Sequence, residues 1–527
     1  MKLNEFRSIW NKAIEENPPL CDGASKKLVE IFTNVFDIEC IEYLQGENTA
    51  FFLVDMSSLG YSRLDLNILA VVSPSTDEKK AFEDLRFEQI IREEASAEGL
   101  IFKIIIAENP ELLSDLPKRD NTIYLFKEDL ERLLSSLTPQ VAIFDIIHRY
   151  VPLARANPFN TKREARGAMF VGREHELAKL TSSDNFRKNF AVTGARFIGK
   201  TSLLIKAHHY LKHRPFTIKR SFFINANSIQ GLIDLSHRMA WAIDPRRDTR
   251  ISFSSVHLLR LFREASKKGR EPLLLFFDEA DTMLAIDSNT GWNILKVLQE
   301  AIQESYIRIV FAGFNNVDDV LSHPMCPLSF PRYFEHIELK PLTKKELEQL
   351  INNPFNESKI RIDSHIDVIN KIWELSEGYP FIIQYIGEKL FDLSIKRNPP
   401  SITVGDIESH IIGNYDFDKF LKMYFLYNTM RGNEPFLPAR IAAYLYLHKS
   451  EGEPWTDGDF MVKIDSAGYK KLASPEKVSL ALSMLYNMSL LKYTKYGYVL
   501  GLKILIDVIK RCYPDKESLL QLMGDNS

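Results

Sequence analysis

The chain has 527 residues, of which 45% are hydrophobic and 26% are charged, and this length predicts several domains rather than one hydrophobic core. No apolar run reaches the roughly 18 residues that a membrane-spanning helix needs, so we expect no membrane contact. The N-terminal segment carries acidic residues where a signal peptide needs an apolar stretch, and the 4 cysteines form no CxxC pair, so we expect a cytoplasmic protein without disulfides or structural zinc.

The net charge is divided unevenly along the chain. Residues 1–150 contain 16 Lys and Arg against 27 Asp and Glu, a net charge of −11, whereas the whole chain carries −3. The remainder therefore carries +8, and the charge pattern predicts that residues 1–150 form a separate, acidic unit.

In residues 1–150, apolar segments alternate with amphipathic ones, which predicts an α/β domain. Asp55 and Asp65 lie on or beside predicted strands, as nuclease carboxylates do, but no Glu-x-Lys partner follows them. We therefore favour a non-catalytic sensor or docking domain of unknown role. The predicted strands are 50–56, 65–72, 100–106 and 121–126, and the predicted helices are 78–98 and 127–136.

Residues 151–169 have two prolines, a basic cluster and little apolar periodicity, which predicts a linker. Residues 170–342 then alternate helices with continuous apolar runs, as in a parallel sheet covered on both faces. Helical periodicity over 343–415 predicts a helical lid, and residues 416–527 combine helices with a hairpin, which predicts a winged helix. The strands predicted for the parallel sheet are 190–194, 221–226, 272–278, 308–313 and 334–339.

The first of these strands runs into a loop with the pattern G-x-x-x-x-G-K-[ST], and a predicted helix follows from Ser202. In such a P-loop, backbone N–H groups and the helix N-terminus bind phosphates. We expect Lys200 to reach the β- and γ-phosphates and the Thr201 hydroxyl to bind Mg²⁺. The alternative is an ordinary glycine turn. The loop consists of Gly194, Ala195, Arg196, Phe197, Ile198, Gly199, Lys200 and Thr201.

The strand predicted at 272–278 ends in Asp278 and Glu279. Open α/β sheets bind ligands at the carboxyl ends of their strands, so Asp278 is a candidate magnesium ligand and Glu279 a candidate catalytic base. Residues 278–281, Asp-Glu-Ala-Asp, also match the sequence box of one helicase superfamily. That reading fails because no Ser-Ala-Thr element and no second motor domain follow.

Two further segments resemble those of prokaryotic AAA+/STAND ATPases. Residues 170–177, Phe-Val-Gly-Arg-Glu-His-Glu-Leu, resemble the element that precedes the P-loop in that family, and Glu377-Gly378-Tyr379-Pro380 resembles its G-x-P element. The resemblance covers residues 157–415 and, less closely, the C-terminal region. It implies ATP or ADP as the nucleotide, with Gly172 and Arg173 beside its base and sugar and Pro380 reporting its state. Helix breaking is the alternative role of the G-x-P element.

The resemblance also implies residues that sense the γ-phosphate. Asn315 follows the strand after Asp278 and is the expected sensor, with Asn316 in reserve and a plain loop asparagine as the alternative. Arg332 falls where such ATPases place an arginine that acts in cis or across a subunit interface, and a surface arginine is the alternative. The lid lacks a plain second arginine sensor, which implies slow turnover.

Three basic segments, 211–220, 244–250 and 263–270, are expected at the sheet edge opposite the P-loop. They favour nucleic acid or the acidic N-terminal domain as a partner, unless they are simply basic residues at helix C-termini. In the predicted winged helix, Lys470, Lys471, Lys492 and Lys495 are candidate contacts to a DNA backbone, but the recognition helix has few side chains that read bases.

The predicted function is an ATP-hydrolysing switch that couples nucleotide state to flanking domains, with a protein effector or self-association as the output. Two alternatives stay open. One is a DNA-associated AAA+ ATPase resembling origin or transposition ATPases, and the other is a nucleotide-bound scaffold that does not hydrolyse.

Overall fold

The computed structural model divides the chain into two compact units. The first contains residues 1–171, 348–368 and 384–406, and the second contains 172–347, 369–383 and 407–527. No helix in the described part is long and apolar enough to cross a membrane. The described residues are 37–44, 49–55, 67–72, 103–106, 122–125, 127–135, 157–161, 164–165, 169–182, 188–213, 221–243, 254–269, 272–314, 317, 320–329, 332–431, 434–448, 453–488 and 490–515.

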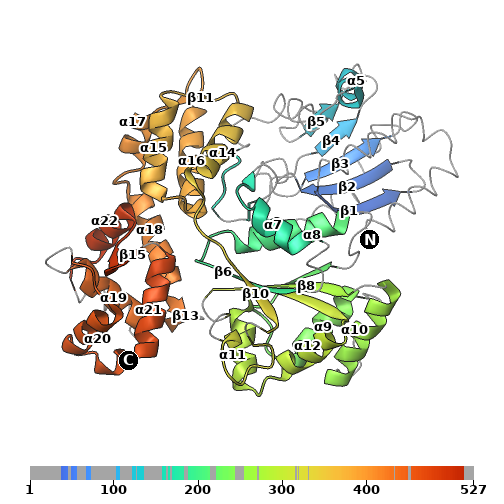
Figure 1. The fold of residues 1–527 in the computed structure, drawn as a ribbon. Helices are drawn as coiled ribbons and strands as arrows, with labels where there is room; N and C mark the ends of the chain where they lie inside the picture. Colours follow the sequence, from blue (N-terminus) through green and yellow to red (C-terminus); the bar gives the residue numbers. More distant parts are fainter. Residues whose placement is uncertain are drawn as a thin grey trace. The chain divides into compact units, whose positions relative to one another are not determined.

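A mixed sheet lies at the start of the first unit (Figure 1). Its strands follow chain order: the pairs β1–β2 and β2–β3 are antiparallel, and the pairs β3–β4 and β4–β5 are parallel. The predicted strands correspond to β2–β5, and α5 (Lys127–Ser135) to a predicted helix. β1 was not predicted, and the register shift between Ile38 and Cys40 interrupts its alternation. The predicted helix 78–98 and Asp65 lie outside the described residues. The bounds are β1 (Asp37–Leu44), β2 (Thr49–Asp55), β3 (Asn67–Val72), β4 (Lys103–Ile106) and β5 (Thr122–Leu125).

Residues 157–160, within the predicted linker, are packed in the first unit. Phe159 is fully buried, with ring centroids 5.6 Å from Phe355 and 6.5 Å from Phe391. Asn157 Nδ2 donates to the Glu388 carbonyl at 2.9 Å. This segment is therefore anchored against the helices α14 (Lys344–Glu357) and α16 (Pro380–Ser394), a contact that composition alone did not predict.

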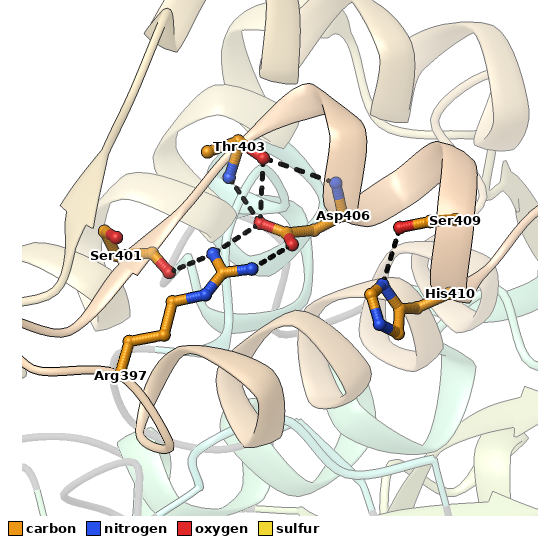
Figure 2. Close-up of polar contacts among 6 residues, drawn as sticks. All are labelled: Arg397, Ser401, Thr403, Asp406, Ser409 and His410. Atoms are coloured by element: carbon orange, nitrogen blue, oxygen red, sulfur yellow. Dashed lines mark hydrogen bonds and ion pairs between the residues drawn. The ribbon is translucent and has the colours of Figure 1, made fainter.

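A polar cluster fixes the start of α17 (Val404–His410) in the same unit (Figure 2). Asp406 Oδ2 accepts hydrogen bonds from the Thr403 N–H at 2.7 Å and the Thr403 hydroxyl at 3.0 Å. Arg397 donates to both carboxylate oxygens of Asp406 and to the Ser401 carbonyl. Burial alone would raise the pKa of Asp406, but the hydrogen bonds from Arg397 and Thr403 hold it below its ordinary value. The neighbouring elements are β11 (Arg361–Ile362) and β12 (Ser401–Ile402), which pair in parallel, and the helix α15 (His365–Ser376).

The second unit is built on a five-stranded parallel sheet with the order β10-β6-β9-β8-β7. All residues of β6, β8 and β9 are buried, as expected for strands covered on both faces. Each predicted strand agrees with an observed one to within a residue at either end. The strands are β6 (Asn189–Thr193), β7 (Ser221–Asn225), β8 (Leu273–Asp278), β9 (Ile307–Ala312) and β10 (Phe334–Glu338).

Helices cover both faces of this sheet (Figure 1). α7 and α8 lie on one face, and α9 to α12 lie on the other, where their apolar residues form one core with the strands. The predicted α/β class is confirmed for this part of the chain. The helices are α7 (Glu174–Thr181), α8 (Lys200–His213), α9 (Leu232–Ile243), α10 (Ser255–Gly269), α11 (Ala280–Asn289) and α12 (Asn293–Gln303).

The C-terminal part of the second unit consists of helices and a hairpin. α19 packs on α20 and α21, α21 packs on β15, and α18 packs on α22. The hairpin turns at Lys495 and Tyr496, and Gly497, the first residue of β16, has a positive φ of 123°. The winged-helix assignment stays a prediction. The elements are α18 (Tyr415–Asn428), β13 (Met430–Arg431), β14 (Glu434–Pro435), α19 (Leu437–Leu447), α20 (Asp457–Ser466), α21 (Pro475–Asn487), β15 (Leu491–Thr494), β16 (Gly497–Leu500) and α22 (Lys503–Cys512).

Candidate phosphate-binding site

The loop between β6 and α8 has the backbone that a phosphate cradle requires. Gly194 and Gly199 have φ angles of 139° and 105°, which side-chain-bearing residues rarely adopt. A Cβ at Gly194 would lie 2.8 Å from the Leu339 carbonyl oxygen. α8 begins at Lys200, so its first N–H groups face the loop. These contacts favour the P-loop reading over an ordinary turn.

Lys200 turns its ammonium group onto its own loop. Nζ donates to the carbonyl oxygens of Gly194 at 2.9 Å and Ala195 at 2.8 Å. Burial lowers the pKa of Lys200 to about 8, although Asp281 and Asp278 raise it in part. Loop N–H groups and a helix N-terminus beside a lysine are suited to bind a phosphate group.

Thr201 and Asp278 meet at the carboxyl edge of the sheet. The Thr201 hydroxyl donates to Asp278 Oδ2 at 2.8 Å. Burial raises the pKa of Asp278, and the hydrogen bond from Thr201 opposes that rise. A hydroxyl and a carboxylate oxygen are ligand types that Mg²⁺ accepts together with substrate phosphates, so the two residues fit the predicted metal site.

Glu279 and Asp281 follow Asp278 into α11. Glu279 has a left-handed backbone with φ of 50°. Its side chain is exposed, so water reaches its carboxylate. Asp281 Oδ2 accepts the Phe314 N–H at 2.7 Å and thereby ties α11 to the end of β9. From the sequence, Asp281 was interpreted only as part of the helicase box, although its position three residues after Asp278, near the start of a helix, indicates a place at the same edge of the sheet. Asn315 and Asn316 lie outside the described residues.

Arg173 binds the P-loop rather than standing free for a nucleotide. Its guanidinium is buried and donates to the carbonyl oxygens of Ile198 at 3.3 Å and Lys340 at 2.6 Å. Burial lowers the pKa of Arg173, and Glu176, Glu346 and Glu174 raise it in part. Gly172 has a positive φ of 74°, which favours glycine, and a Cβ there would lie 2.5 Å from the Glu346 side chain, which would have to shift.

The G-x-P element also has a demanding backbone. Gly378 has φ of 84°, and a Cβ there would lie 2.0 Å from the Leu342 carbonyl oxygen. Pro380 is the first residue of α16. Tyr379 donates its hydroxyl proton to the Asn487 carbonyl at 2.6 Å, and Lys492 pairs with Glu377 at 2.7 Å. These bonds join the element to α21 and to the hairpin.

An aromatic stack connects the P-loop to the G-x-P element and to α18. Phe197 has a left-handed φ of 65°, and its ring lies 4.4 Å from the Phe381 ring at an interplanar angle of 15°. Tyr427 contacts Phe197 edge-on at 5.9 Å. The buried Asn428 accepts the Arg196 N–H through Oδ1 at 3.0 Å. No motif spacing predicts Asn428 or Tyr427, because α18 lies more than two hundred residues beyond the loop.

Arg332 is not among the residues that the structure brings to the P-loop. It lies two residues before β10, at the amino edge of the sheet, whereas the P-loop follows the carboxyl end of β6. The guanidinium is 5.3 Å from the Tyr333 ring centroid. The position of Arg332 at the amino edge of the sheet argues against a role in cis, while a role across a subunit interface and the alternative of a surface arginine both stay open.

The predicted basic segments are described only in part. Residues 211–213 end α8, and 263–269 form the last turns of α10. Both lie at helix C-termini, where lysine and arginine are common. Residues 214–220, 244–250 and 270 lie outside the described residues.

No protein-family model matches the chain, and no curated protein matches it. Among solved structures, the chain is similar to the Walker-type ATPase PABY2304 of Pyrococcus abyssi, with 17% identity and a TM-score of 0.49, over 67% of this chain and 99% of that chain. It is also similar to the Aeropyrum pernix ORC2 protein in ADPNP–ADP complexes (13% identity, TM-score 0.43, 67% of this chain and 94% of that chain). The Aeropyrum pernix ORC1 protein in complex with DNA matches with 14% identity and a TM-score of 0.36, over 67% of this chain and 94% of that chain. These TM-scores are too low to assign a function, which therefore depends on the residues of the site.

Proposed function

We propose that this chain is an ATP-binding and ATP-hydrolysing switch of the AAA+/STAND type. The contact of Thr201 with Asp278 is the observation that carries the proposal. It joins the residue after the P-loop lysine to the carboxylate at the end of β8, and both come from the edge at which parallel sheets bind ligands. Lys200 and the loop N–H groups would hold the phosphates beside this pair.

In this proposal each residue has a separate task. Thr201 and Asp278 would hold Mg²⁺, which neutralises phosphate charge when bound. Glu279, exposed at the start of α11, would orient and polarise the attacking water. Lys200 would leave the carbonyls of Gly194 and Ala195 and pair with the phosphate oxygens.

The contacts of Phe197 and Arg196 support a switch rather than a plain hydrolase. Phe197 stacks on Phe381, next to Pro380, and Asn428 holds the Arg196 N–H. A change in the P-loop conformation on nucleotide binding would therefore act directly on α16 and α18 through these contacts. Two packed arrangements of these helices are what a nucleotide-driven switch needs.

Hydrolysis by the purified full-length chain tests the assignment. We expect Lys200→Ala to abolish nucleotide binding, and Glu279→Gln to bind ATP but lose turnover by at least about a hundredfold. Lys340→Ala and Glu304→Gln, which change exposed side chains, serve as controls with unchanged activity. Normal hydrolysis by either site variant would refute the proposal. ADP retention without any turnover by the wild type would favour the scaffold alternative.

The C-terminal hairpin favours DNA association as a second candidate function. Tyr493 and Tyr496 are 64% and 68% exposed, and Lys495 Nζ lies 4.7 Å from the Tyr496 ring centroid. Lys470 and Lys471 are exposed as well, whereas Lys492 is paired with Glu377. Exposed aromatic and basic side chains are suited to contacts with a nucleic-acid backbone and bases.

Measurements of ATP turnover with and without duplex DNA separate the two candidates. If DNA is the partner, stimulation is strong, is lost in Glu279→Gln and weakens steeply with salt concentration. Turnover that is slow and indifferent to DNA leaves the switch with a protein trigger.

A further inference from the structure

Arg196 is a second cation of the P-loop that the mechanism above does not use. Its backbone N–H is held by Asn428, while its guanidinium carbon lies 5.7 Å from the centroid of the Phe314 ring. Phe314 follows the end of β9, and its own N–H is bonded to Asp281. The side chain thus extends from the P-loop toward the end of the neighbouring strand, between the two segments that border the phosphate site.

The guanidinium of Arg196 has an unsatisfied donor within the described part of the chain. Its Nε–H is buried, with no hydrogen-bond partner among the described residues, and no described carboxylate forms an ion pair with it. A buried donor on a charged group costs free energy unless something accepts it. The positive charge of Arg196 also contributes to the lowered pKa of Lys200, so the two cations are close.

Two neighbouring cations at the carboxyl edge of a sheet call for an anion with more than one charged group. The P-loop lysine and N–H groups suffice for the β-phosphate of either ADP or ATP. Only ATP brings a further phosphate, and the planar fork of an arginine matches its oxygens better than an ammonium does. The neighbouring side chain, Phe197, stacks on Phe381 instead, so Arg196 and Phe197 contact different segments.

We propose that Arg196 binds the γ-phosphate of ATP in cis and makes the site prefer ATP over ADP. This inference rests on the proposed function and deepens it. It assigns the sensing of the third phosphate to a residue inside the P-loop, whereas Arg332 lies at the opposite edge of the sheet.

Nucleotide affinities of the full-length chain test this role. Binding of Mg²⁺ with ADP and with a non-hydrolysable ATP analogue is measured calorimetrically for wild type, Arg196→Ala and Arg196→Lys, and unfolding temperatures are recorded alongside. We expect Arg196→Ala to weaken the binding affinity for the ATP analogue by at least about tenfold and the affinity for ADP by less than about threefold. Turnover at saturating ATP falls by about a hundredfold, and Arg196→Lys recovers part of both losses.

Each other outcome overturns the inference in a distinguishable way. If Arg196→Ala weakens the affinities for ADP and for the ATP analogue equally, Arg196 only shapes the loop. If both affinities are unchanged, its side chain only covers Phe314. If wild type binds neither nucleotide and matches Lys200→Ala, the proposed function itself fails together with the inference.

Discussion

Lys200 donates hydrogen bonds to two carbonyl oxygens of its own loop, and phosphate oxygens would have to replace both as acceptors. Its pKa of about 8, lowered by burial, is below the ordinary value of 10.5. Above pH 8, Lys200 in the nucleotide-free chain is therefore mostly a neutral amine, which attracts phosphate poorly. The folded chain also releases this proton at a lower pH than the unfolded chain does, so this residue makes stability rise between about pH 8 and 10.5.

We expect nucleotide affinity to fall as pH rises through the pKa of Lys200. Between pH 7 and pH 9 the dissociation constant increases by about tenfold, because binding has to restore the proton. Calorimetry in buffers with different ionisation enthalpies detects that proton uptake at pH 8.5. Lys200→Arg, whose charge does not titrate in this range, serves as the control. A flat profile for wild type would show that the ammonium stays charged.

Phe197 shows how one element constrains another. A bulky residue with positive φ costs on the order of 1–3 kcal/mol of local strain, which the surroundings have to offset. The stack on Phe381, with Tyr427 at its edge, provides such an offset. The aromatic contact therefore stabilises the loop conformation and the position of α16 together.

A double-mutant cycle measures this coupling. Phe197→Ala and Phe381→Ala, alone and combined, are compared by chemical denaturation, and we expect an interaction free energy of about 0.5–1.5 kcal/mol. Phe197→Ala combined with Tyr415→Ala is the control, because Tyr415 is 77% exposed and we expect additivity. Additive losses for Phe197 and Phe381 would mean that the stack does not hold the loop.

The start of α17 gives a second prediction at this scale. Because the pKa of Asp406 is lowered in the folded chain, its contribution to stability is complete above its ordinary pKa of 3.8 and disappears as pH falls through the lowered value. We expect Asp406→Asn to lower the free energy of unfolding by about 1.5–3 kcal/mol at pH 7, and by less as pH drops below about 4. Thermal unfolding across that pH range checks this. Asp363→Asn, which affects a more exposed ion pair with Arg361, is the control and should change little.

Features that depend on residues close together in the sequence were predictable, and contacts between distant segments were not. The strands β6 to β10 were predictable because continuous apolar runs are a local signal. The positions of Thr201 and Asp278 were predictable because Asp278 ends such a strand and Thr201 comes at the end of a loop pattern that follows one. Asn428 was not predictable, since its partner is a backbone N–H on a distant loop. Arg332 was placed by its neighbours in sequence, and only the parallel pairing of β10 with β6 showed which edge it occupies.

At the scale of the whole molecule, the position of Arg332 raises the question of assembly. If this arginine completes a site in another copy, Arg332→Ala and Lys200→Ala are each inactive, yet a mixture of the two regains part of the activity. The restored sites combine an intact P-loop from one variant with an arginine from the other. Wild-type turnover by Arg332→Ala alone, or a mixture that stays inactive, would assign Arg332 to the surface.

The strand order has a further consequence for amide exchange with solvent. β6 lies between β10 and β9, so the strand that carries the P-loop is hydrogen-bonded along both sides. Its amides exchange only when the sheet opens as a whole, and the strand has no free edge along which to slip. Deuterium uptake that depends on nucleotide is therefore confined to the loop after β6 and to the helices that touch it, while the sheet remains a fixed reference against which those segments move.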